Sequence, residues 1–312
     1  MGILPCLGLW YDYSMKSITQ LAIIGSTASG KTSLAIKVAQ KHNAHILSLD
    51  SLSVYKQINI ASAKPSTQEQ QNIKHFGIDV LLPNQTFDVG LFIKLYHQVY
   101  TQCQKENKNL IIVGGTSFYL KMLCEGISQM PSISNQTKAK VKEQQQDLEK
   151  SYQLLQDIDP DYMSSIESKD SYRIGKALEI YVETSLSPSE YFKAFPPIAT
   201  ITAPLPIYQI TWDRDALRQR IALRTRLMLQ DGLIDEVCIL EKKYTRSPNS
   251  MKSIGIKETL AYLDGVYDKK MLEEKITTNT ARLAKRQNTF NNSQFQGVIR
   301  GSVEELERYL IN

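Results

Sequence analysis

The chain has 312 residues, of which 42% are hydrophobic and 22% charged, and its formal net charge is +5. This length allows one large or two modest domains, and the mild positive charge is compatible with a nucleic-acid or phosphorylated ligand without identifying one. The four cysteines are scattered with no C-x-x-C spacing, and no apolar run approaches membrane-spanning length; this excludes a disulfide framework, a zinc knuckle and a membrane span, so we expect a cytoplasmic protein with reduced thiols.

The N-terminal stretch matches no targeting signal. Cys6 stands where a myristoylation pattern needs Ser or Thr, and the stretch lacks the cationic start and small-residue cleavage site of a signal peptide. Met15 lies just before the first expected strand and is an alternative start. We therefore expect residues 1–17 to be an N-terminal extension outside the folded core.

The first expected strand, residues 18–24, runs into "GSTASGKT", which fits the P-loop pattern and is followed by a helical pattern. Its glycines let backbone N–H groups converge on phosphate oxygens, the helix N-terminus adds a partial positive charge, and Lys31 adds a full one. The Thr32 hydroxyl can ligate Mg²⁺. The alternative is a glycine turn with a surface lysine. The residues predicted to bind a diphosphate or nucleotide are Gly25, Ser26, Thr27, Ala28, Ser29, Gly30, Lys31 and Thr32.

The second expected strand, residues 44–50, ends on Asp50. A lone Asp at a strand end is usually a turn former or a helix cap. The third expected strand, residues 109–115, ends in glycines, although an ATPase would hold Mg²⁺ with an acidic residue there. Because the carboxyl ends of parallel strands face the ligand crevice, we expect Asp50 to lie near the P-loop, beside whatever reacts with the phosphorylated ligand.

The later part of the chain changes character. Residues 127–197 are polar and helical in pattern, residues 206–212 read as a strand that returns to the sheet, and the rest is mostly helical, with Asp213 as a helix cap and Gly232 as a helix stop. Strands that alternate with glycine turns and helices predict a parallel sheet. The predicted fold class is α/β, with a P-loop NTPase-like parallel sheet core at 18–126 and 198–312, a helical insertion domain at 127–197 and a helical C-terminal part.

Several strings together, in the same order, resemble the bacterial tRNA dimethylallyltransferases of the IPP transferase family. They include "GSTASGKTSLAIKVA", "LDSLSVYKQINIASAKPS", "IIVGGTSFYLKMLCEGI", "DSYRIGKALEIY" and "TTNTARLAKRQNTF". The resemblance runs from about residue 18 to residue 297. It implies transfer of a dimethylallyl group from dimethylallyl diphosphate to N6 of adenosine 37 in tRNA. It also implies that the insertion clasps the anticodon stem-loop.

The resemblance assigns roles to single residues. Asp50 matches the family's general base, so we expect it to face adenine N6 and not to serve as a cap. Thr116 would help to place the reacting groups. Lys31, Thr32, Mg²⁺ and Arg224 would neutralise the charge that grows on the departing diphosphate. The expected catalytic residues are therefore Asp50, Thr116 and Arg224.

Two basic stripes on expected helices are visible without the resemblance. Arg220 and Arg224 are i, i+4 neighbours, so both can point at one anion; the alternative for Arg224 is a surface salt bridge. Lys275, Asn279, Arg282 and Arg286 form a second stripe, suited to phosphates or merely solvated. With those that the resemblance adds, the residues expected to contact tRNA are Asp50, Ser51, Leu52, Ser53, Thr116, Lys138, Arg173, Lys176, Lys252, Lys257, Arg282 and Arg286.

Two other functions share these features. A small-molecule kinase that uses ATP would need the same P-loop and could use the arginine-rich helix as a lid. A P-loop protein could also bind nucleotide only as a switch or RNA-binding module. We expect a monomer with tRNA and dimethylallyl diphosphate as its partners and no membrane association.

Overall fold

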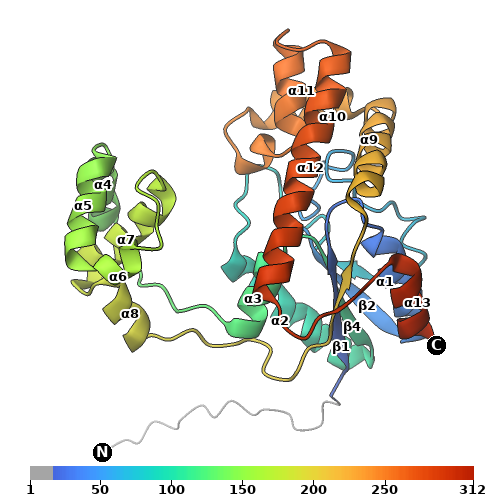
Figure 1. Cartoon of the computed structure of the whole chain (residues 1–312), viewed down its shortest axis with the longest axis horizontal. Helices are drawn as coiled ribbons and strands as arrows, with labels where there is room; N and C mark the ends of the chain where they lie inside the picture. The colour runs from blue at the N-terminus through green and yellow to red at the C-terminus, as the bar shows by residue number, and fades with distance from the viewer. Residues whose placement is uncertain (1–16) are drawn as a thin grey trace, which may run out of the picture. The chain divides into compact units, whose positions relative to one another are not determined.

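The computed structural model describes residues 17–312, and within them six parallel strands form one sheet in the order β3-β2-β4-β1-β5-β6 (Figure 1). The expected N-terminal extension lies outside the described residues except for its last position. The strands are β1 (Gln20–Gly25), β2 (Ala44–Leu49), β3 (His75–Phe76), β4 (Asn109–Gly114), β5 (Ile207–Ile210) and β6 (Ile299–Gly301).

The predicted α/β class with a parallel sheet is confirmed, and the four strands expected from the sequence are β1, β2, β4 and β5. The two edge strands were missed. β3 has two residues and β6 has three. Such short segments carry no periodic pattern of their own, and each forms only because a longer neighbouring strand offers it a partner.

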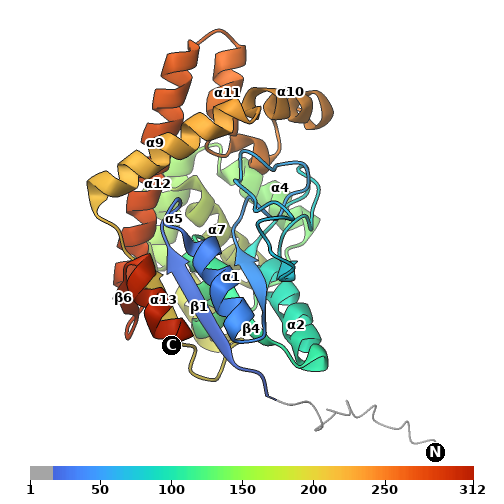
Figure 2. The ribbon, with the colours of Figure 1, turned by 90° about the vertical axis from the view of Figure 1, so that its right-hand side faces the viewer.

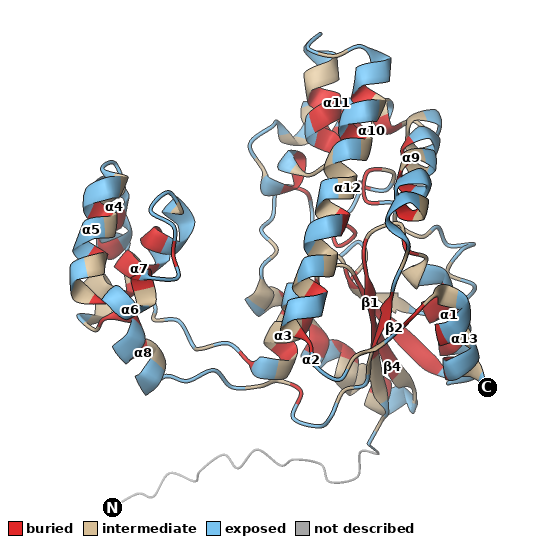
Figure 3. Ribbon diagram, in the orientation of Figure 1, coloured by how far each residue is buried: buried red, intermediate tan, exposed pale blue. Residues whose placement is uncertain are grey.

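Helices cover both faces of the sheet. α1 (Lys31–Lys41) and α13 (Val303–Ile311) pack on one face, whereas α2 (Val89–Glu106) and the end of α12 (Lys269–Gln294) pack on the other (Figure 2). The central strands are therefore buried on both sides (Figure 3). This explains why they read as continuous aliphatic runs rather than as alternating patterns.

Three helices and the first part of a fourth, α12, lie beyond the carboxyl ends of the strands (Figure 1). They are α9 (Arg214–Gln230), α10 (Leu233–Tyr244), α11 (Ile256–Leu263) and α12, with the short 3₁₀ helix η1 (Asn249–Lys252) before α11. Asp213 caps α9 as expected. α9 ends at Gln230, and Gly232, with φ of 100°, is the N-cap residue before α10, so it separates two helices.

α3 (Ser117–Glu125) follows β4 and leads into the second compact unit of the chain, Met122–Thr202. This unit is helical apart from an isolated bridge between Ile127 and Ile198, and it has a core of its own. In the range 17–312 no helix has the length and apolarity to cross a bilayer. The helices of the unit are α4 (Asn135–Gln144), α5 (Leu148–Ile158), α6 (Pro160–Met163), α7 (Ser171–Thr184) and α8 (Pro188–Ala194).

Candidate active site

The loop from Gly25 to Thr32 joins β1 to α1 and is shaped to receive an anion. Ala28 has φ of 62° and Gly30 has φ of 91°, so the chain turns tightly before α1 begins at Lys31. The first N–H groups of a helix have no acceptor within it, and Gly30 offers no side-chain cap. A cavity of about 1060 Å³ opens over this loop. The N–H groups and the positive end of the helix dipole therefore face a space that an anion can enter.

Two side chains from the start of the C-terminal part hold the outside of this loop. The Trp212 indole N–H donates to the carbonyl of Ser29 at 2.9 Å, and Arg220 Nε donates to the carbonyl of Ala28 at 2.9 Å. The Arg220 guanidinium also lies over the Trp212 ring, 4.5 Å from its centroid. Arg220 therefore supports the loop, and only its remaining nitrogens are available to the anion that we expected it to share with Arg224. No role for Trp212 was expected from the sequence.

A glutamine of α12 completes the support. Gln287 Oε1 accepts the backbone N–H of Thr27 at 2.8 Å, and Gln287 Nε2 donates to the carbonyl of Gly115 at 3.0 Å. A Cβ added at Gly115 would stand 2.5 Å from Gln287 Nε2, so only glycine admits this approach. The P-loop and the end of β4 are thus joined by one side chain. No role for Gln287 was expected from the sequence, although it belongs to the string "TTNTARLAKRQNTF" that carries the resemblance.

Three charged groups gather at the loop. Lys31 Nζ donates to the carbonyl of Ser26 at 2.5 Å, and Arg224 Nη1 donates to Thr27 Oγ1 at 3.2 Å. Burial lowers the pKa of Lys31 to about 8, against the attraction of the Asp50 carboxylate, and Arg224 lowers it further. Burial also lowers the pKa of Arg224, and Asp50 again opposes the shift. The two cations are therefore only partly compensated, and a bound diphosphate would supply the missing negative charge.

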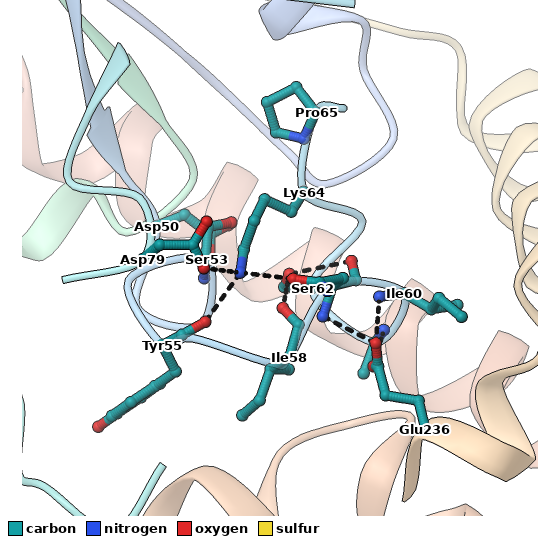
Figure 4. A network of polar contacts seen from close by, with 12 residues as sticks. Asp50, Ser53, Tyr55, Ile58, Ile60, Ser62, Lys64, Pro65, Asp79 and Glu236 are labelled. Atoms are coloured by element: carbon teal, nitrogen blue, oxygen red, sulfur yellow. Dashed lines mark hydrogen bonds and ion pairs between the residues drawn. The ribbon is translucent and has the colours of Figure 1, made fainter. Parts of the chain in front are cut away.

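Asp50 follows the last residue of β2 and lies in the turn that begins there (Figure 4). Its Oδ1 accepts the backbone N–H groups of Leu52 at 2.8 Å and Ser53 at 3.0 Å. The expectation that Asp50 is not a cap is therefore wrong, because the carboxylate does cap this turn. Its Oδ2 makes no hydrogen bond within residues 17–312 and is free for another partner. Thr116 lies beside the same turn, where its Oγ1 accepts the Ser51 N–H at 3.2 Å.

Asp50 lies where two cavities meet. The larger cavity contains the P-loop, and the smaller one, of about 460 Å³, contains Thr116 and several apolar side chains. Because both cavities share the residues around Asp50, two different ligands could reach the carboxylate from different sides. The residues common to both cavities include Thr27, Asp50, Gly115, Arg224, Met228 and Gln287. Those that line only the smaller one include Thr116, Phe118, Ile254, Arg286 and Phe290.

The expected metal ligand also faces the larger cavity. Thr32 is exposed there, at the start of α1. Among residues 17–312, no three His, Cys, Asp or Glu side chains are grouped so that they could hold a metal ion. Mg²⁺ commonly binds through one or two protein oxygens together with substrate phosphates. The exposed Thr32 hydroxyl in this cavity fits that kind of site.

Several of the residues expected to contact tRNA lie in the unit that holds the P-loop. Lys252, Lys257, Arg282 and Arg286 are exposed, and Arg286 lines the smaller cavity. Not every member of the stripe expected on α12 is free to bind phosphate. Asn279 Nδ2 donates to the buried Glu258 carboxylate at 2.7 Å.

The other expected tRNA contacts, Lys138, Arg173 and Lys176, lie in the unit Met122–Thr202 and are exposed. Arg173 pairs with Asp170, and Lys176 Nζ lies 2.7 Å from Glu179 Oε2. Both pairs lie at the surface, one between α7 and its N-cap residue Asp170 and the other within α7. Such pairs contribute little to stability, so these cations can exchange their partners for phosphates at small cost.

Comparison with known proteins gives one consistent result. The family model described as IPP transferase matches residues 53–294. A tRNA dimethylallyltransferase of Sulfurovum sp. (strain NBC37-1) is 65% identical over 95% of this chain and 98% of its own length. The tRNA dimethylallyltransferase of Sulfurimonas denitrificans is 54% identical over 95% of this chain and 99% of its own length.

Solved structures agree on the fold. The tRNA isopentenylpyrophosphate transferase of Staphylococcus epidermidis has a TM-score of 0.66 at 29% identity, covering 94% of this chain and 97% of that one. The Bacillus halodurans enzyme of the same description has a TM-score of 0.68 at 26% identity, covering 94% and 96%. A eukaryotic dimethylallyltransferase acting on tRNA has a TM-score of 0.81 at 24% identity, covering 93% and 75%, and supports the fold alone.

Proposed function

The chain belongs to the IPP transferase family, and from that membership we propose that it transfers a dimethylallyl group from dimethylallyl diphosphate to N6 of adenosine 37 in tRNA. The observation that carries this proposal is Asp50 at the junction of two cavities, one with a P-loop and two cations and one with apolar walls. The anionic donor would occupy the first cavity. The target base would enter the second.

In the proposed reaction N6 of adenine attacks the allylic carbon that bears the diphosphate. A bond forms between N6 and that carbon, the bond from the carbon to the diphosphate oxygen breaks, and one N6 proton is lost. Asp50 Oδ2, which has no other partner in the described chain, would hydrogen-bond or accept that proton. Oδ1 would keep the carboxylate in place through its bonds to the turn. Thr116, beside Asp50, would help to place the reacting groups.

The departing diphosphate takes the electron pair and gains charge as it leaves. Lys31 and Arg224 lie at the loop that would bind it, and they would neutralise this charge in a site partly shielded from water. We propose that the Thr32 hydroxyl holds Mg²⁺ when the donor is bound, together with the oxygens of the diphosphate. The ion would supply further neutralisation of the diphosphate oxygens.

The target adenosine must leave its stack to reach Asp50, and base flipping requires contacts to the flanking nucleotides. We propose that the helical domain predicted at 127–197, within the unit Met122–Thr202, clasps the anticodon stem-loop through Lys138, Arg173 and Lys176. Lys252, Lys257, Arg282 and Arg286 would add phosphate contacts near the smaller cavity. We further propose that the enzyme acts as a monomer in the cytoplasm, because one chain supplies both cavities and tRNA is a cytoplasmic substrate.

The test is incubation with labelled dimethylallyl diphosphate and total tRNA, followed by digestion and nucleoside analysis. The expected product is labelled N6-(dimethylallyl)adenosine. At equal concentration dimethylallyl diphosphate should also raise Tm more than ATP does, because the ligand that binds the folded state more tightly stabilises it more. Phosphoryl transfer from ATP to a small molecule, with no labelled nucleoside, would support the kinase alternative. That alternative is not favoured, because close relatives are named tRNA dimethylallyltransferases.

A further inference from the structure

The segment after β2, residues 50–65, carries Asp50 and has no regular helix or strand. Its interior is nevertheless fully buried, since Val54 and Ile58 have 0% exposure and pack against α10, α11 and α12. A segment without a helical or sheet ladder must satisfy its backbone groups elsewhere. The position of Asp50 therefore depends on whatever holds this segment.

One carboxylate holds three consecutive backbone N–H groups of the segment. Glu236, in the first turn of α10, accepts from Asn59 and Ile60 through Oε2, both at 2.8 Å, and from Ala61 through Oε1 at 2.9 Å. Figure 4 shows the carboxylate pointing into this turn. Hydrogen bonds to an ionised acceptor are roughly twice as strong as neutral ones. Glu236 thus attaches the segment to α10 by three such bonds.

A lysine holds the same turn from the other side. Lys64 Nζ donates to the carbonyl of Tyr55 at 2.8 Å, to Asn59 Oδ1 at 2.9 Å and to Asp79 Oδ1 at 2.6 Å (Figure 4). The ammonium group has three protons, and all three are used. Lys64 lines the larger cavity, but it has no proton left for a phosphate, and its side chain is only 6% exposed. Asn59 is held by both Glu236 and Lys64, so the two attachments act on one residue.

Hydrogen bonds lead from this turn to the carboxylate of Asp50. Asp79, the partner of Lys64, donates its backbone N–H to the carbonyl of Ser53 at 3.2 Å. Ser53 in turn donates its own N–H to Asp50 Oδ1 at 3.0 Å. Glu236 is therefore connected to Asp50 by consecutive bonds, although it lies in a different element and does not touch the P-loop.

We propose that Glu236 is a positioning residue for the transfer reaction. By holding three N–H groups of the segment 50–65, it determines where Asp50 lies relative to Lys31 and Arg224. The proposal rests on the proposed prenyl transfer. A displacement of about 1 Å of a reacting group can lower a rate about 100-fold, so a small movement of this segment suffices.

The test compares Glu236→Gln with a matched control, Glu241→Gln. Glutamine keeps the size of the side chain, but its NH₂ group cannot accept the third N–H. Glu241 lies on the same helix, and within residues 17–312 its carboxylate pairs only with Arg246, at the surface. At saturating tRNA and donor, well below the Tm of each variant, Glu236→Gln should lower the single-turnover rate about 10- to 100-fold. The Kd for dimethylallyl diphosphate should stay within about twofold, as no bond of Glu236 reaches the P-loop. Glu241→Gln should change neither quantity.

A double-mutant cycle separates positioning from general stabilisation. If Glu236 acts through Asp50, Glu236→Gln should have no further effect on the rate in an Asp50→Asn background. Multiplicative effects in the double variant, or an unchanged rate in Glu236→Gln, would overturn the proposal. A loss of donor affinity in Glu236→Gln as large as its loss of rate would also overturn the proposal, because the whole site would then have been disturbed.

Hydrogen exchange gives an answer that does not depend on activity. Glu236→Gln should speed exchange of the Leu52 and Ser53 amides, which are bonded to Asp50. Faster exchange at residues 59–61 with unchanged protection at Leu52 and Ser53 would show that the attachment does not reach Asp50. If the wild-type protein made no prenylated tRNA, the proposed function would fail, and this exchange result would still decide the positioning.

Discussion

Replacing Asp50 by Asn separates the bonds that this side chain makes in its turn from its proposed role as a base. An Asn Oδ1 can still accept the N–H groups of Leu52 and Ser53, which lie at 2.8 and 3.0 Å in the structure. The two bonds become neutral instead of charge-assisted. Such a change weakens each bond by about 1 kcal/mol, so we expect a loss of about 2 kcal/mol at most and a fall in Tm of a few degrees.

The proposed base role predicts a much larger effect on the rate. An amide cannot accept the N6 proton, and a general base typically contributes about 10²–10⁴-fold. This corresponds to about 3–5 kcal/mol in the barrier, well above the loss of stability. Donor affinity should be nearly unchanged or slightly better, because removing the carboxylate removes a negative charge near the diphosphate.

The assay is single-turnover transfer at saturating tRNA and donor, with Tm measured on the same samples. Asp50→Ala is the companion variant: it should lose the rate to the same extent and lose more stability, because it also removes the acceptor of both N–H groups. A transfer rate within a few-fold of wild type in Asp50→Asn, together with a lower Tm, would show that Asp50 only caps the turn. The base assignment would then be refuted.

Three further predictions follow from the charges. Lys31→Ala should weaken donor binding and transfer together, because Lys31 would contact the diphosphate in the ground state and in the transition state; unchanged donor affinity with full turnover would remove Lys31 from the site. Since the pKa of Lys31 is about 8, the ammonium is charged below that pH and neutral above it. Donor affinity should therefore fall as pH rises through about 8, and Lys31→Arg should flatten the profile measured by calorimetry. Arg173→Ala and Lys176→Ala should raise the apparent KM for tRNA and reduce its salt dependence with donor binding intact, and an effect on donor binding alone would contradict the clasp.

The central strands and the P-loop could be predicted because their signals are contiguous. β1, β2, β4 and β5 each carry an aliphatic run that reflects burial on both faces. The Gly25–Thr32 pattern is complete within eight residues and needs only a strand before it and a helix after it. The edge strands β3 and β6 could not be predicted, since two or three residues have no periodicity.

The candidate site was predicted only in part. Lys31, Asp50, Thr116 and Arg224 do lie together around the two cavities. Their expected roles came from the resemblance to the family, but the sequence did not show which residues they contact. Arg220 shows the difference, because its spacing relative to Arg224 suggested a shared anion, and the structure shows its Nε bonded to a loop carbonyl.

By itself the sequence determined the parallel sheet, the glycine-containing loop between β1 and α1, and the family, because the signals for each come from residues that are neighbours along the chain. The tertiary structure alone decided how the loop and the turn at Asp50 are held. Gln287 reaches the P-loop across 260 residues, and Glu236 reaches the turn at Asn59 across 177. A hydrogen bond forms between groups that the fold brings within about 3 Å of each other. The residues next to Gln287 and Glu236 in the sequence do not indicate which distant group each side chain will bind.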